Sequence, residues 1–292
     1  MATGRHAFTN EELPGLLDGA IGGATRPLYA ELCRLSGLPG TRVNEGLVLA
    51  FADACARRAA RADRLVVAMA TLDADEAPGD TALEILPVCG IVALSARMED
   101  APRLDARSMR ILHDACDDLR FRVRDAAIVA LSRLGAAKGE EVLREVGAWM
   151  DGYFHAACVL AAATTPDFLA RIDDASLAVE RLHQGFALAH DAPRAASRYP
   201  GHKALLEALS RAPAPLALRL GAPVLDELSL WSRKKDPVIR ETVLRAVRAP
   251  RLRGRFAADV ARIEAEVAAA GPAPRDPGKE IRPTRKRGRA RR

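Results

Sequence analysis

Three residues of one predicted helix have the types and spacing of metal ligands. Glu180 and His183 repeat the Glu-x-x-His spacing of di-iron helical bundles, and His190 lies seven residues beyond His183 on the same helix face. A di-iron site needs a second such motif and further glutamates on facing helices, and the chain has no second copy. The spacing therefore favours a solvated glutamate beside a partly buried histidine. We predict no metal site, no cofactor and no catalytic residue.

Two clusters of basic residues are candidates for binding a polyanion. They consist of Arg120 and Arg122 in the first, and of Arg233, Lys234 and Lys235 in the second. Each cluster lies in the turn before a predicted helix or at the start of that helix, where we expect exposed side chains able to contact phosphates. A solvated turn without a ligand is the alternative for both clusters.

The end of the chain is a dense run of positive charge. The run contains Arg285, Lys286, Arg287, Arg289, Arg291 and Arg292. Residues 275–292 carry a net charge of +7, whereas the whole chain carries +6. The other 274 residues therefore sum to −1. Such a tail binds nucleic acid, acidic proteins or anionic membranes without reading sequence. A purely solubilising tail fits the same composition equally well.

Known catalytic motifs are missing from the sequence. Gly37-Leu-Pro-Gly-Thr lacks the Lys-Ser/Thr of a phosphate-binding loop, and no Gly-x-Ser-x-Gly elbow occurs. The loops expected between helices are short, which leaves little room for an inserted catalytic module.

The composition predicts an all-α protein. Hydrophobic residues make up 49% of the chain and aromatic residues only 4%, with Ala and Leu dominating the apolar set. Helices pack well on Ala and Leu, and no long stretch alternates with a period of two. No apolar run approaches the roughly 20 residues of a membrane span, and no signal peptide precedes the first helix. Five cysteines without a Cys-x-x-Cys motif indicate buried thiols in a reducing compartment, and we expect a cytoplasmic protein.

One helical segment occurs twice in diverged form, at 118–135 and at 236–248. Each copy has a short turn, then a β-branched residue followed by Arg, then a helix with one apolar stripe. Gly135 is expected to end the first helix, and Pro250 to stop the second. Spaced copies of one helical unit predict a stacked-repeat architecture.

These two segments resemble HEAT repeats, whose second helix typically begins after a turn with an Asp and a following Val-Arg pair. Asp118 and Arg124 match the family's Asp and Arg, and Asp236 and Arg240 match the later turn and Arg. The resemblance implies that such an Asp–Arg pair links successive repeats by hydrogen bonds. Lys234 stands six residues before Arg240, so that link is expected to be broken in the second copy. The match is good over 111–135, fair over 225–248 and compositional elsewhere.

The resemblance implies an α-α superhelix of antiparallel helix pairs. We expect a flexible N-terminus at 1–9, a solenoid at 10–270 and a basic tail at 271–292 that is disordered because it has almost no apolar residues to bury. We expect a non-enzymatic scaffold that binds a protein partner. The alternative is a nucleic-acid-associated protein that uses the tail and the basic turns. This alternative includes a DNA-repair glycosylase of the superhelical type, because those enzymes place aromatic residues and an Asp in a cleft. Trp149, Asp151, Tyr153 and Phe154 form a similar set, although an interface between two helices explains them more simply.

Overall fold

The computed structural model describes residues 12–271, and all regular structure in this range is helical, without a strand. The all-α prediction is therefore confirmed. The α-helices, in chain order, are α1 (Glu12–Ile21), α2 (Thr25–Leu35), α3 (Glu45–Ala56), α4 (Asp63–Ala70), α5 (Ile85–Met98), α6 (Ala106–Cys116), α7 (Phe121–Lys138), α8 (Glu140–Glu145), α9 (Tyr153–Ala163), α10 (Pro166–Leu169), α11 (Ala175–His190), α12 (Pro200–Arg211), α13 (Pro213–Leu220), α14 (Ala222–Ser232), α15 (Pro237–Val247), α16 (Pro250–Arg255) and α17 (Ala257–Ala269).

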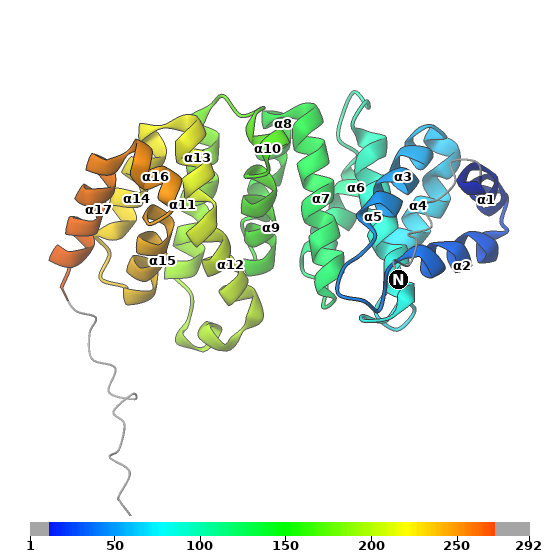
Figure 1. The fold of residues 1–292 in the computed structure, drawn as a ribbon, viewed down its shortest axis with the longest axis horizontal. Helices are drawn as coiled ribbons and strands as arrows, with labels where there is room; N and C mark the ends of the chain where they lie inside the picture. Colours follow the sequence, from blue (N-terminus) through cyan, green and yellow to red (C-terminus); the bar gives the residue numbers. More distant parts are fainter. Residues whose placement is uncertain (1–11, 272–292) are drawn as a thin grey trace, which may run out of the picture.

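The helices follow one another along the long axis of the molecule, from α1 at one end to α17 at the other (Figure 1). Six of them form a central row in which each contacts the next: α3, α5, α7, α9, α12 and α15. Further helices cover this row, with α4 on α5, α6 on α7, α11 on α9 and α12, and α14 and α17 on α15. Neighbours in space are thus close neighbours in sequence.

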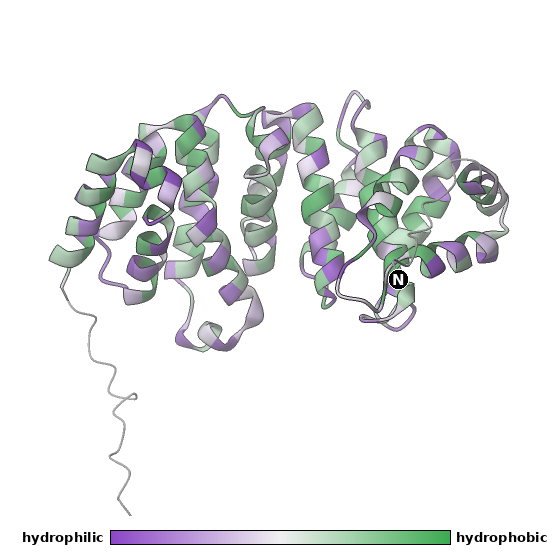
Figure 2. Cartoon of the chain, in the orientation of Figure 1, coloured by the Kyte–Doolittle hydropathy of each residue, from purple (hydrophilic) through white to green (hydrophobic). Residues whose placement is uncertain are grey.

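Helix α5 lies at the centre of the N-terminal half. Every residue of α5 except Arg97 is buried, because α3, α4 and α7 all pack against it. Such all-round burial explains why α5 is apolar on all sides rather than along one stripe. Figure 2 shows hydrophobic residues predominating in α5 and α9, with hydrophilic residues on the outer parts of the other helices. No helix among residues 12–271 is long and apolar enough to cross a membrane.

Helix α7 does not end at Gly135, contrary to our expectation. It continues to Lys138 and ends at Gly139, whose φ of 60° is the left-handed conformation that favours glycine. Gly135 serves a different purpose, because the ring of Phe168 lies against its Cα. A Cβ at Gly135 would come within 2.0 Å of that ring.

Prolines begin helices in this protein more often than they interrupt them. Pro213 and Pro215 both lie in the first turn of α13. Pro87 likewise lies in the first turn of α5. The missing N–H of proline has no intrahelical partner to lose in a first turn. Helix α3 begins at Glu45 without a proline, and the Asn44 side chain caps it by accepting from the Leu47 N–H at 3.2 Å.

Candidate functional site

Arg120 is buried and holds the preceding loop, so the expectation of an exposed cation there is wrong. Its guanidinium donates to the carboxylate of Asp118 at 2.6 and 2.9 Å. The same group donates to the carbonyls of Leu72, Asp73 and Ala77, each at 2.9 Å. All five N–H donors of the arginine are therefore occupied. Arg120 has no donor left for a phosphate.

Arg122 is also buried, which again contradicts the expected exposure. One nitrogen of its guanidinium donates to the carboxylates of Asp80 and Glu84, each at 2.8 Å, and the other donates to the Gly40 carbonyl at 3.1 Å. Glu84 is fully buried, so Arg122 supplies the charge that its carboxylate needs inside the protein. The first basic cluster is thus a structural clamp on the 72–84 segment.

Arg124 does not form the expected link through the Asp118 carboxylate. That carboxylate is taken by Arg120, and Arg124 donates to the backbone carbonyl of Asp118 instead. Arg124 is half-buried, and its guanidinium lies 4.4 Å from the ring centre of Phe154 on α9. A cation–π contact therefore connects α7 to the next helix of the central row.

The second copy of the repeat places its matching residues differently. Asp236 caps α15 by accepting from the N–H groups of Val238 and Ile239 at 2.8 and 3.3 Å. Arg240 is buried and donates to the carbonyl of Gly271, just beyond α17. In both copies the arginine donates to a backbone carbonyl rather than to an aspartate.

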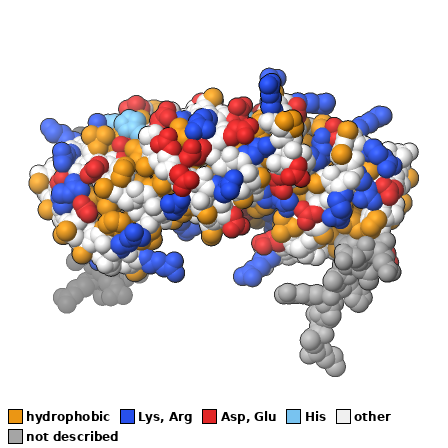
Figure 3. Space-filling view, turned by 90° about the horizontal axis from the view of Figure 1, so that it is seen from above, with side chains coloured by type: hydrophobic (Ala, Val, Ile, Leu, Met, Phe, Trp, Pro, Cys, Tyr) orange, Lys and Arg blue, Asp and Glu red, His pale blue; other side chains and the backbone are white. Residues whose placement is uncertain are grey.

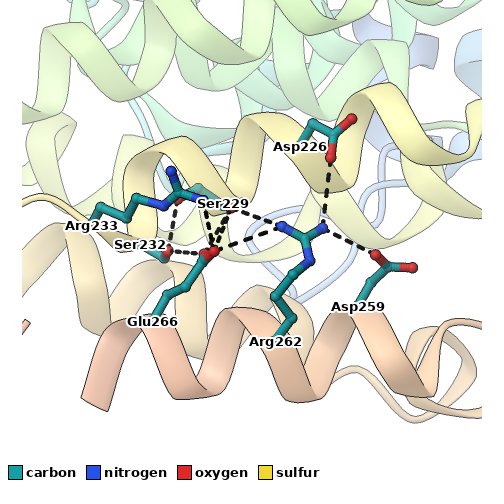
Figure 4. A network of polar contacts seen from close by, with 7 residues as sticks. All are labelled: Asp226, Ser229, Ser232, Arg233, Asp259, Arg262 and Glu266. Carbon is teal, nitrogen blue, oxygen red and sulfur yellow. Dashed lines mark hydrogen bonds and ion pairs between the residues drawn. The ribbon is translucent and has the colours of Figure 1, made fainter. Parts of the chain in front are cut away.

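The second basic cluster is only partly free to bind an anion. Arg233 is exposed, but it pairs with Glu266 at 2.8 Å within a network between α14 and α17 (Figure 4). Lys234 lies over the ring of Trp231, with 5.2 Å between its Nζ and the ring centre. Lys235 is exposed and forms no ion pair with the described residues. Only this last cation has the exposure and freedom that polyanion binding requires.

Glu266 is the acceptor at the centre of the network in Figure 4. Partial burial acts to raise the pKa of its carboxyl, but hydrogen bonds from Arg233, Ser229 and Ser232 outweigh burial and lower the pKa to about 2. Arg262 extends the network through Asp259 at 3.0 Å. This arrangement fastens α17 to α14.

The Glu-x-x-His spacing on α11 does not bring its two residues together. Glu180 pairs with the neighbouring Arg181 at 2.8 Å, while the Nδ1 of His183 lies 2.8 Å from Glu227 on α14. The indole of Trp231 donates to the same carboxylate at 2.5 Å. His190 contacts the Trp231 ring from the next turns of α11, at 5.9 Å between ring centres. These contacts fix α11 to α14.

The aromatic residues near α9 separate into two groups that face different neighbours. Trp149 is buried and meets the ring of His113 edge-on at 5.2 Å between centres. Tyr153 and Phe154 instead contact Tyr199, at 6.2 and 5.9 Å between centres. The set therefore does not line one common cleft.

Sequence reasoning missed a cluster that forms around Asp151. His113 Nε2 lies 3.7 Å from Asp151 Oδ1, and His155 Nδ1 lies 3.8 Å from the same oxygen. The two imidazole rings stack, with centres 3.9 Å apart and planes within 11°. Burial, and then the neighbouring His113, lower the pKa of His155, so its ring favours the neutral form. The only sequence signal was the four-residue spacing from Asp151 to His155, which joins the two across one helical turn.

Two hollows flank α7 on the face of the central row that the covering helix α6 leaves open. The α5–α7 hollow, of about 360 Å³, is lined by residues of α3, α5 and α7 together with the loop before α3. The α7–α9 hollow, of about 380 Å³, is lined by residues of α7, α9 and α12. Phe121 and Asp125 line both hollows and form the ridge between them. Leu49 and Val129, at 39% and 40% exposure, place apolar surface in the α5–α7 hollow.

Asp125 is an unpaired acid on this ridge. Its carboxylate forms no hydrogen bond or ion pair with any residue between 12 and 271. Neighbouring atoms exclude part of its water, which raises the pKa of Asp125, although Arg124 and Arg122 act in the opposite direction. An acid left without a partner on an apolar ridge is a position where an external cation would gain an ion pair.

The face of the molecule drawn in Figure 3 has no single sign of charge. Figure 3 shows acidic and basic side chains interspersed over the face seen from above, with hydrophobic side chains between them. The tail arginines and Lys286 lie outside the described residues, as do the expected flexible N-terminus at 1–9 and all of the expected tail except Gly271.

Comparisons with known proteins do not assign this chain to a family. No protein-family model matches it, and no curated protein or solved structure is significantly similar to it.

Proposed function

We propose that this protein is a non-enzymatic scaffold whose central row of helices binds a segment of a partner protein. The observation that carries the proposal is the pair of hollows beside α7, with exposed apolar side chains and the unpaired Asp125 between them. Contiguous exposed apolar surface with a polar rim is typical of protein-binding sites. The proposal includes a HEAT-like solenoid, which the sequential packing of α3, α5, α7, α9, α12 and α15 supports.

The chemistry of the ridge indicates what the partner segment contains. Phe121 is 47% exposed and Leu119, in the turn before α7, is 90% exposed, so both offer apolar area at the end of the ridge. A segment with apolar side chains spaced to enter both hollows would bury these residues. Asp125 would pair with a Lys or Arg of the same segment, and this pairing would offset the loss of its remaining water. We therefore expect an apolar segment that carries one basic residue facing α7.

Photo-crosslinking in the native cell tests this proposal. A photoreactive amino acid at Val129 should give one predominant adduct, which mass spectrometry identifies together with the crosslinked peptide. The same amino acid at Arg110 is the matched control, because Arg110 is exposed on α6 and lines neither hollow. Adducts that are the same from both positions, or none from Val129, would contradict the proposal.

The nucleic-acid alternative now depends on the tail alone, because the body's predicted basic residues are mostly buried or paired. Deleting residues 272–292 removes the tail and keeps Gly271, whose carbonyl accepts from Arg240. Retention on DNA by the full chain that disappears with the deletion would place polyanion binding in the tail. Retention that survives the deletion would place it in the helical body and would count against the scaffold proposal.

A further inference from the structure

The two histidines of the Asp151 cluster come from different helices. His113 lies in the last turn of α6, Asp151 in the turn before α9, and His155 in the first turn of α9. One ligand atom from each lies within 4.8 Å of the other two. Within residues 12–271 no other three His, Cys, Asp or Glu side chains meet in this way.

The donor set suits a particular class of ion. Two imidazoles and one carboxylate bind Zn²⁺ and neighbouring divalent transition metals, whereas Mg²⁺ and Ca²⁺ prefer oxygen ligands alone. The Nδ1 of His155 is buried and has no hydrogen-bond partner, so a ring nitrogen next to Asp151 is left unsatisfied. Buried polar atoms are normally satisfied, and a bound cation would satisfy this one.

Only small movements separate this arrangement from a coordinating one. Donor atoms around tetrahedral zinc lie roughly 3.3 Å apart when the bonds are about 2.0–2.1 Å long. The present distances to Asp151 Oδ1 are 3.7 and 3.8 Å. Asp151 has a side chain 62% exposed and His113 one 28% exposed, so the carboxylate can shift and the His113 ring can turn out of the stack. His155, at 13% exposure, is the fixed member of the set.

The surroundings of the cluster favour a positive ion. His113 Nδ1 lies 3.7 Å from the carboxylate of Asp114, on the side of the ring away from Asp151. A carboxylate behind a histidine orients the ring and makes it a better metal ligand. Asp117 adds a further negative charge that acts on His155. Trp149 packs edge-on against His113 and limits how far its ring can turn.

We propose that His113, Asp151 and His155 form a binding site for a divalent transition-metal ion of the Zn²⁺ type. His155 and His113 supply ring nitrogens and Asp151 supplies one carboxylate oxygen. Because Asp151 is exposed, the fourth position of a tetrahedral ion opens to water. The site joins α6 to the start of α9, so metal binding would also strengthen the contact between these two helices. The proposal is independent of the partner-binding hollows.

Titration of the full, untagged chain with Zn²⁺ in a calorimeter tests the site. We expect one Zn²⁺ per chain, and we expect His155→Ala and His113→Gln each to weaken binding roughly 100-fold or more, since each removes a direct ligand. Mg²⁺ should give no binding heat. The matched control is the double variant His183→Ala/His190→Ala, which removes the other histidine pair and should bind Zn²⁺ as tightly as the wild type.

A measurement on the wild type avoids dependence on how well the variants fold. Zn²⁺ should shift the imidazole NMR signals of His113 and His155 and leave those of His183 and His190 in place. Wild-type binding no tighter than that of His113→Gln, absence of Zn²⁺ binding, or signal shifts confined to other histidines would each overturn the proposal.

Discussion

Arginine side chains fix the junction between the 72–84 segment and α7, and they do so by burying their charges. Arg120 donates to three backbone carbonyls of the segment after α4, and Arg122 neutralises the buried Glu84. Their partners lie between 38 and 48 residues away in the sequence, apart from Asp118 and the carbonyl of Gly40. Periodicity cannot reveal such pairings, which is why both residues were predicted to be exposed.

Replacing Arg120 should destabilise the protein strongly. Arg120→Ala removes the guanidinium that pairs with the Asp118 carboxylate and donates to the Leu72, Asp73 and Ala77 carbonyls. Losing one partner of a buried ion pair costs about 3–5 kcal/mol. Urea unfolding followed by circular dichroism gives the free energy of unfolding. Arg110→Ala serves as the control, because Arg110 is exposed and has no ion pair among the described residues. Equal, small effects of the two substitutions would show that the clamp contributes little.

Glu266 makes stability depend on pH in the acid range. Its pKa is lowered from an ordinary 4.5 to about 2, so its stabilising contacts are complete above 4.5 and are lost as the pH falls toward 2. We expect Glu266→Gln to be less stable than the wild type near neutral pH, with the difference shrinking as the pH falls through that window. Unfolding free energies measured at several pH values give this difference. Glu241→Gln, at an exposed position, should show no such trend.

At the scale of helices, apolar periodicity predicted most elements, but it could not predict which residues pack against each helix. The helices within 118–135 and 236–248 were recognised from their apolar stripes. The structure buries Val123 and Leu131 of α7, and Ile239 and Val243 of α15. We misplaced the end of α7 because a glycine that ends a helix and a glycine that makes room for a neighbouring side chain look the same in a sequence. Only the structure shows that Phe168 of α10 requires the missing side chain.

Gly135→Ala should therefore destabilise the protein, although alanine favours helices over glycine. The added Cβ would meet the Phe168 ring, and overpacking of this kind costs about 1–3 kcal/mol. Gly15→Ala in α1 is the matched control, since a Cβ there meets nothing within 4 Å. That control should stabilise the protein by about 0.5–1 kcal/mol. Thermal unfolding of the two variants compares them, and stabilisation by both would contradict the close contact.

At the scale of the whole molecule, composition was sufficient to predict an all-α protein, and the repeated segments suggested the order in which helices stack. The hollows beside α7 could not be predicted, because they arise from residues of α3, α5, α9 and α12 that share no sequence pattern. The Asp151 cluster was hidden for the same reason, since His113 joins it from another helix. The hollows and the Asp151 cluster both depend on contacts between residues that are far apart in the sequence.

Binding of a partner segment at the ridge of α7 is tested by the dissociation constant of the crosslinked partner. Val129→Glu introduces a charge into the α5–α7 hollow, where apolar contact is expected to drive binding. We predict that it weakens binding by roughly 30-fold or more, the effect of losing about 2 kcal/mol at a binding hot spot. Arg110→Glu on α6 should leave the dissociation constant unchanged. Equal affinity of the partner for Val129→Glu and the wild type would contradict binding of the partner at the ridge of α7.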